Sequence, residues 1–149
     1  MKKQDHFRIA TVDARKPFIL CITFGDGATM PVDCSAIIER IPALAPLKAP
    51  ELFVKAHAGE WGLTVDWIPG ELDMAGDNLR AEAVEQSGGI SHERIWEWMH
   101  RNGLSLDTAA EALGISRRML AYYRSGQKPI PRHIWLACIG WETERTMAA

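Results

Sequence analysis

The chain has 149 residues, 47% of them hydrophobic and 24% charged, a composition that excludes a disordered chain and allows one ordinary domain or two small ones. Its formal net charge of −2 is, for the chain as a whole, unfavourable for nucleic acid. The first thirty residues hold no uninterrupted apolar run of the kind found in a signal peptide, and runs such as 18–22 are too short to cross a membrane. We therefore expect a cytoplasmic protein.

The cysteines and histidines do not have the spacing of a metal site. Cys21, Cys34 and Cys138 are scattered and odd in number, without the paired spacing that zinc requires. Cys21 lies in an apolar run, so we expect a small buried residue. His92 and His100 are eight residues apart, which is a poor spacing for two ligands on one helical face. We expect no metal and no cofactor.

The first part of the chain begins with the period-two alternation of strands. Three strands are predicted, over residues 8–13, 18–24 and 30–32. The Asp26-Gly27 step tolerates a positive φ and favours a tight turn between the second strand and the third. Asp33 is expected to cap a short helix, because its carboxylate can accept free amide protons of the first turn. This helix carries Ile37, Ile38 and Ile41.

Another pair of strands is predicted over residues 52–56 and 63–67, joined by a turn through residues 59–62. In the second of these strands one face is expected to hold Leu63, Val65 and Trp67. After the Pro69-Gly70 stop, a helical stripe is formed by Leu79, Ala83 and Val84. These elements predict a small α+β domain.

A domain boundary is predicted at Gln86-Ser87-Gly88-Gly89, where small flexible residues coincide with a change from strand-like to helical periodicity. The charge balance changes there too. Residues 1–87 hold nine Lys and Arg against thirteen Asp and Glu, a net −4, whereas residues 88–149 hold eight against six, a net +2. We therefore expect two domains, 1–86 and 87–149, the second with a local basic surface that suits phosphate.

Several short sequences of the first domain resemble a small bacterial domain family of unknown function. They are Phe24-Gly25-Asp26-Gly27, Val32-Asp33, Leu52-Phe53, Trp67-Ile68-Pro69-Gly70 and Leu72-Asp73. The resemblance covers roughly residues 7–80 and implies an α+β fold without any established chemistry. Members of that family are often encoded beside toxin–antitoxin genes, and some carry a C-terminal helix-turn-helix.

The second domain is predicted to be all-α, with about four helices. Serine residues suit the starts of the first three helices, at Ser91, Ser105 and Ser116. Glycine residues suit their ends, at Gly103, Gly114 and Gly126. Pro131 stands at the first helical position of the fourth.

The second and third of these helices have the spacing of a helix-turn-helix. Two helices that cross closely need a small residue at the crossing, here Ala110, and a glycine in the turn, here Gly114. Apolar residues that can seal the contact are Leu113, Ile115, Leu120 and Tyr123. The run 106–116, and its continuation through Arg124-Ser125-Gly126, resembles the Cro/repressor family of helix-turn-helix proteins. This resemblance implies a third helix that enters the major groove of DNA and a protein that binds as a dimer.

Carried onto this sequence, the resemblance assigns base reading to the start of the third helix, at Arg117 and Arg118, with Tyr122 about one turn further on. The planar fork of an arginine can donate two bonds to guanine. Positions that suit the phosphate backbone are Ser105, Ser116, Gln127, Lys128 and Arg132. Leu106 departs from the family pattern, which often has a glutamine there.

The sequence therefore predicts an α+β chain in which a small mixed domain precedes a helix-turn-helix domain. The leading hypothesis is a transcriptional regulator that binds double-stranded DNA as a homodimer. Its more specific form is an antitoxin that represses its own operon. The alternative is a protein-interaction module whose acidic first domain binds a basic partner such as a toxin. A ligand-sensing first domain is a third alternative. Because no nucleophile setting, phosphate loop or metal spacing is found, we expect no enzymatic activity.

Overall fold

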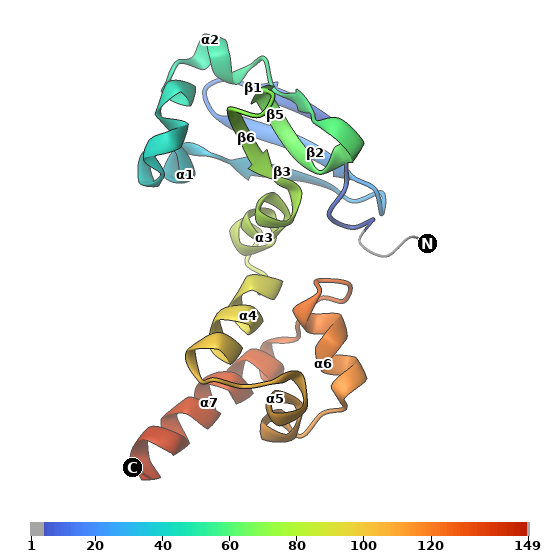
Figure 1. The fold of residues 1–149 in the computed structure, drawn as a ribbon, viewed down its shortest axis with the longest axis vertical. Coiled ribbons are helices and arrows are strands. Elements are labelled where there is room, and N and C mark those ends of the chain that lie inside the picture. Colours follow the sequence, from blue (N-terminus) through green and yellow to red (C-terminus); the bar gives the residue numbers. More distant parts are fainter. Residues whose placement is uncertain (1–4, 149) are drawn as a thin grey trace. The chain divides into compact units, whose positions relative to one another are not determined.

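The computed structural model of the chain describes residues 5–148, and these divide into two compact units that meet between Gln86 and Ser87. The first unit mixes strands and helices, and the second is all-helical (Figure 1). The expected α+β fold class is confirmed. In the described part of the chain, no helix combines the length and the apolar character needed to span a bilayer.

The described part of the first unit contains two antiparallel three-stranded sheets. The first sheet has the order β1-β2-β3, with β1 (Ile9–Arg15), β2 (Ile19–Phe24) and β3 (Thr29–Asp33). The second has the order β4-β5-β6, with β4 (His57–Ala58), β5 (Thr64–Ile68) and β6 (Leu72–Ala75). The strands β1 and β4 lie beside each other. Strand β6 was not expected from the sequence.

Helical segments cover the sheets of the first unit. They are α1 (Ser35–Arg40), the 3-10 helix η1 (Pro42–Lys48), α2 (Pro50–Phe53), the 3-10 turn η2 (Glu60–Gly62) and α3 (Gly76–Gln86). The last of them packs against β3 and β6. Its Gln86 side chain accepts the amide proton of Asp33 at 2.8 Å and donates to the carbonyl of the same residue at 2.9 Å. The apolar core lies between these layers and includes Leu20, Phe24, Phe53, Val65 and Leu79.

Two expectations for the strands of the first unit are wrong. The strand over 52–56 is absent, because Pro50 at the first helical position begins α2 and Leu52 belongs to that helix. Leu63 precedes β5 and is 66% exposed, while the adjacent Asp66 and Trp67 are both buried because the pairing register shifts between Asp66 and Ile68.

The cap of α1 is also different from the prediction. The N-cap position is held by Cys34, not by Asp33. The Asp33 carboxylate nevertheless accepts a first-turn amide proton, from Ser35 at 2.9 Å, as well as the Ser35 hydroxyl at 2.6 Å. Cys21 is half-buried on the outer face of β2, so the expectation of a buried Cys21 is wrong as well.

The second unit is a bundle of four helices: α4 (His92–Arg101), α5 (Leu106–Leu113), α6 (Arg117–Arg124) and α7 (Arg132–Ala148). The expected N-cap positions are confirmed at Ser91, Ser105 and Ser116. The core contains the fully buried Ile95, Trp98, Ala109, Leu120 and Cys138. A two-pronged ion pair, from Arg101 Nε and Nη2 to the carboxylate of Glu142 at 3.0 and 2.6 Å, joins α4 to α7.

Candidate nucleic-acid interface

A glycine in the left-handed backbone conformation joins α5 to α6. Gly114 has φ 69° and ψ 30°, a conformation that only glycine adopts without strain. The amide of Ile115 then donates to the carbonyl of Ala110 at 3.1 Å, which closes the end of α5. Ala110 and Leu120 are buried at the crossing of the two helices. These local interactions hold α6 at a fixed angle to α5.

Serine caps fix the starts of both helices. The Ser105 hydroxyl accepts the amide proton of Thr108 at 3.1 Å, and the Thr108 hydroxyl accepts that of Ser105 at 2.8 Å, a reciprocal capping box. At α6 the Ser116 hydroxyl accepts the amide proton of Met119 at 3.0 Å. The capping role of both serines is confirmed, while the predicted contact of each with phosphate stays a prediction.

Arg117, the first residue of α6, is held by an acid on the neighbouring helix. Its Nε lies 3.1 Å from Oδ1 of Asp107, and the two side chains are 67% and 76% exposed. Asp107 is in the first turn of α5, where its negative charge also interacts favourably with the helix dipole. In the free protein, part of the positive charge of Arg117 is therefore neutralised across the turn.

Tyr122 connects two cations of the predicted interface. Arg118 Nε donates to the Tyr122 hydroxyl at 3.1 Å, and its guanidinium lies 5.6 Å from the centre of the ring. The ammonium of Lys128 lies 4.5 Å from the same ring centre. The hydrogen bond from Arg118, and then its charge, lower the pKa of the Tyr122 hydroxyl. We call Arg118, Tyr122 and Lys128 the tyrosine cluster.

The loop after α6 is tied back to the same tyrosine. The amide of Lys128 donates to the Tyr122 carbonyl at 3.3 Å, and the Ser125 hydroxyl donates to it at 3.2 Å. The loop therefore holds Lys128 next to α6. The neighbouring Gln127 and the first residue of α7, Arg132, are both exposed. The structure thus brings Arg118, Tyr122 and Lys128 onto one local surface, and Gln127 and Arg132 are exposed positions nearby in the chain.

Leu106 is a packing residue. It occupies the first position of α5, half-buried against the core of the second unit. At this position an apolar packing contact stands where the family that the second unit resembles often has a polar side chain.

The structure adds contacts that sequence reasoning missed. The Arg124 guanidinium, at the end of α6, lies 4.9 Å from the ring centre of Trp96 on α4. These two residues and four others line a shallow groove of about 420 Å³ in the second unit. Arg124 belongs to the run that resembles the Cro/repressor family, but its partner 28 positions earlier carries no signal in the sequence.

The described residues contain no group of three or more His, Cys, Asp and Glu side chains that could hold a metal ion. The surface on α6 presents cations, hydroxyls and helix amides, which are groups that bind anions. The absence of acids between Glu111 and Glu142 leaves Asp107 as the carboxylate paired with this surface.

Comparison with solved structures gives one close likeness. A crystal structure of the protein named Putative DNA Binding Protein from Nitrosomonas europaea is similar with a TM-score of 0.85 and 50% sequence identity. The match covers 93% of this chain and 88% of the other, so both units take part. No protein-family model matches the chain, and no curated protein matches it.

Proposed function

The chain belongs to the same family as the Nitrosomonas europaea protein, and on that premise we propose that it binds double-stranded DNA with α6 in the major groove. The observation that carries this proposal is the tight α5–α6 turn at Gly114, which presents Arg117 and Arg118 at the start of an exposed helix. The description of the related protein supports the same class of ligand.

The tyrosine cluster suggests different tasks for the two arginines. Arg118 is oriented by its bond to Tyr122 and is the better candidate to read a guanine, because a bidentate contact needs a fixed planar fork. Arg117 must first leave Asp107, so we assign it to a phosphate or to a second base. We assign Lys128, with Gln127 and Arg132 nearby in sequence, to contacts with the phosphate backbone of DNA.

Specific binding needs a second copy. A single α6 reads only a few base pairs, and proteins of the Cro/repressor type that the second unit resembles bind two half-sites about one helical turn apart. We therefore propose a homodimer that acts in the cytoplasm as a transcriptional regulator, and as an antitoxin that represses its own operon where a toxin gene is adjacent. The first unit is assigned to the family of unknown function that it resembles.

The test is fluorescence anisotropy with a duplex from upstream of the chain's own gene and a scrambled duplex of equal length. We expect Arg118→Ala to lose about 1–3 kcal/mol of discrimination between the two. Lys128→Ala should weaken binding to both and flatten the salt dependence. Arg145→Ala is the matched control, since it removes one exposed charge from α7 without touching α6. Equal affinity of the wild type and of Arg118→Ala for both duplexes would contradict base reading.

A second candidate function is neutralisation of a basic protein by the acidic first unit. The observation in its favour is the net charge of −4 over residues 1–87. Co-expression with the product of the neighbouring gene tests it: a stable complex, or relief of that product's toxicity, supports it. Both functions are compatible in one chain, because they use different units.

A further inference from the structure

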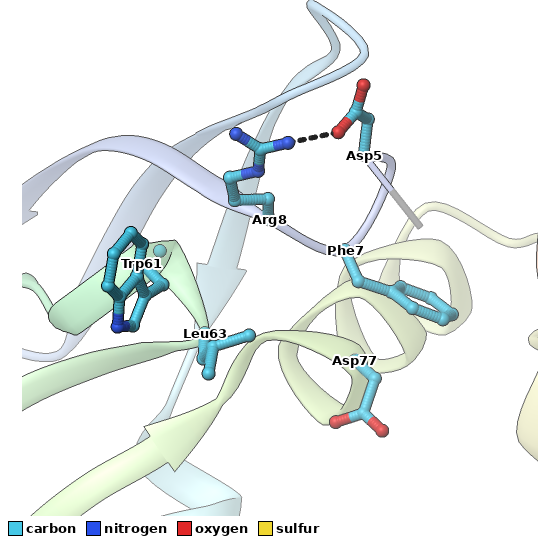
Figure 2. Close-up of a pocket in the computed structure, with 7 residues that line it drawn as sticks. Asp5, Phe7, Arg8, Trp61, Leu63 and Asp77 are labelled. Atoms are coloured by element: carbon cyan, nitrogen blue, oxygen red, sulfur yellow. Dashed lines mark hydrogen bonds and ion pairs between the residues drawn. The ribbon is translucent and has the colours of Figure 1, made fainter. Parts of the chain in front are cut away.

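An exposed tryptophan of the first unit has no task in the proposed DNA binding. Trp61 is 79% exposed, and the following Leu63 is 66% exposed. Both line a hollow of about 330 Å³ together with Asp5, Phe7, Arg8, Gly62 and Asp77. Figure 2 shows Trp61 and Asp77 on either side of Leu63, with Arg8 turned toward Asp5. We call Trp61, Leu63 and Asp77 the Trp61 surface.

The backbone holds Trp61 outward at a conformational cost. Trp61 has φ 60° and ψ 10°, in the left-handed region that a bulky side chain rarely adopts. Gly62 also has a positive φ, of 69°, and a Cβ there would lie 2.5 Å from Arg8 Cγ and 2.6 Å from the Ile9 carbonyl. On the other side, a Cβ on Gly59 would collide with the Thr64 hydroxyl. The turn is thus fixed from both sides, and the indole does not pack into the core in return.

The other tryptophans of the chain have partners. Trp67 and Trp98 are buried. Trp96, Trp135 and Trp141 each have an arginine over the ring, at 4.9, 5.3 and 5.1 Å from the ring centre. Among residues 5–148, Trp61 is the tryptophan that has neither burial nor a cation. The positively charged residue that lines the hollow, Arg8, is already paired with Asp5.

The charge around the Trp61 surface favours a cationic occupant. The Asp77 carboxylate accepts the amide proton of Asn78 at 2.8 Å and forms no ion pair within the described chain. The whole region 1–87 has a net charge of −4, which repels a phosphate backbone and attracts a basic chain. An arginine fits such a site best, because its long side chain can lie over the indole while the guanidinium at its end extends past Leu63 toward the carboxylate (Figure 2).

We propose that the Trp61 surface docks a basic segment of a partner protein, with an arginine side chain over the indole of Trp61 and its guanidinium directed to Asp77. Leu63 contacts the apolar residue beside that arginine. A rigid tryptophan loses little conformational entropy when it binds, which is why exposed tryptophans often dominate protein interfaces. This proposal is independent of DNA binding by the second unit.

The experiment follows the indole and backbone signals of the full-length ¹⁵N-labelled protein by NMR. The probe is the peptide acetyl-Gly-Leu-Arg-Leu-Gly-amide, compared with peptides in which lysine or citrulline replaces the arginine. We expect the Trp61 indole signal to shift saturably with the arginine peptide. Affinity should be a few-fold lower for lysine and at least fivefold lower for citrulline, which has the same shape without the charge.

Variants of the full chain separate recognition from folding. Trp61→Gly should abolish the peptide-induced shifts of the backbone amide signals around Leu63 and Asp77, while the thermal midpoint stays equal or rises, since glycine relieves the positive φ. Asp77→Asn should weaken binding about threefold to tenfold, as expected for one charge-assisted contact. Trp96→Ala and Asp73→Asn are the matched controls, because each makes a similar change at another exposed position and should leave the affinity unchanged.

Four results would overturn the proposal. The first is an unmoved Trp61 signal at millimolar arginine peptide, and the second is an equal response to citrulline. The third is conversion of a dimer into a monomer by Trp61→Gly in sedimentation experiments, which would assign the surface to a second copy of the chain. The fourth is a shift of the Trp61 signal on addition of DNA alone, which would assign it to nucleic acid.

Discussion

We predict that removing the ion pair between Asp107 of α5 and Arg117 of α6 raises the affinity of the protein for DNA. Asp107→Asn removes the carboxylate that lies 3.1 Å from Arg117 Nε. Because the side chains are 67% and 76% exposed, solvent screens the pair, and its loss costs about 0–1 kcal/mol of stability. Loss of a negative charge from the first turn of α5 adds about 0.3–1 kcal/mol. The second unit should therefore stay folded.

The binding of DNA should gain from this change if Arg117 meets a phosphate, because a protein that stays folded does not lose DNA affinity through a small loss of stability. One additional phosphate contact makes the slope of log affinity against log salt more negative by about 0.9. Between about 50 and 200 mM salt, that slope corresponds to about 3.5-fold in affinity. We expect Asp107→Asn to bind both specific and scrambled duplexes more tightly at low salt, and to lose more of that affinity as salt rises.

Anisotropy titrations over a salt series measure both quantities. The matched control is Glu111→Gln, which removes an exposed acid one turn further along α5 that is not paired with Arg117. The reasoning is refuted if the two variants have the same salt slope, because general charge would then explain the change. It is also refuted if Asp107→Asn binds no better than the wild type.

Three further predictions concern stability and reactivity. Leu120→Ala empties a fully buried position and should cost about 3 kcal/mol, so that the second unit unfolds at lower urea while the near-UV signal of the first unit persists. The hydrogen bond and charge of Arg101 lower the pKa of Glu142. The ionised form of Glu142 therefore stabilises the second unit fully at pH values above the ordinary pKa of glutamate. This stability should be lost as pH falls through the lowered value, and Glu142→Gln should flatten that part of a pH–melting curve. Burial raises the pKa of the Cys34 and Cys138 thiols to about 12. Iodoacetamide at pH 8 should therefore label Cys21 alone until urea is added. Labelling of all three thiols in the native protein would contradict this burial.

The helical unit could be predicted from the sequence because its signals are local. Ser105 and Ser116 lie within three residues of the amides that they cap, and Gly114 needs its left-handed conformation whatever surrounds it. The apolar stripe that buries Ile95 and Trp98 repeats at the helical period. Each signal acts within one or two turns, so no knowledge of distant contacts is required.

The sheet unit was harder because short apolar runs are ambiguous. Leu52-Phe53 fits a buried strand as well as a buried helical turn, and Pro50 decides in favour of the helix. In β5, a shift of register after Asp66 places Asp66 and Trp67 in the interior together, against strict alternation. Pairing partners that lie across the sheet set this register, and a single strand does not reveal them.

The contacts of the candidate interface divide in the same way. Arg118 and Tyr122 are four residues apart on one helix, so their hydrogen bond could have been expected from the spacing. The ion pair of Arg117 with Asp107 depends on how α5 and α6 cross. The stacking of Arg124 on Trp96 depends on where a third helix, α4, packs against α6. Sequence reasoning identified the cations and not what holds them.

These partners bear on how the surface on α6 would bind. Two arginines at the start of a helix oppose its dipole, and in the free protein Asp107 and the Tyr122 hydroxyl offset that cost. An arginine that is already ordered loses less side-chain entropy when it meets DNA, whereas one that must leave a carboxylate first loses part of its gain. By this reasoning Tyr122→Phe, which keeps the ring and removes the bond to Arg118, should reduce discrimination between duplexes more than total affinity. A proportional loss on both duplexes would instead make Tyr122 a packing residue, and anisotropy with the two duplexes separates these outcomes.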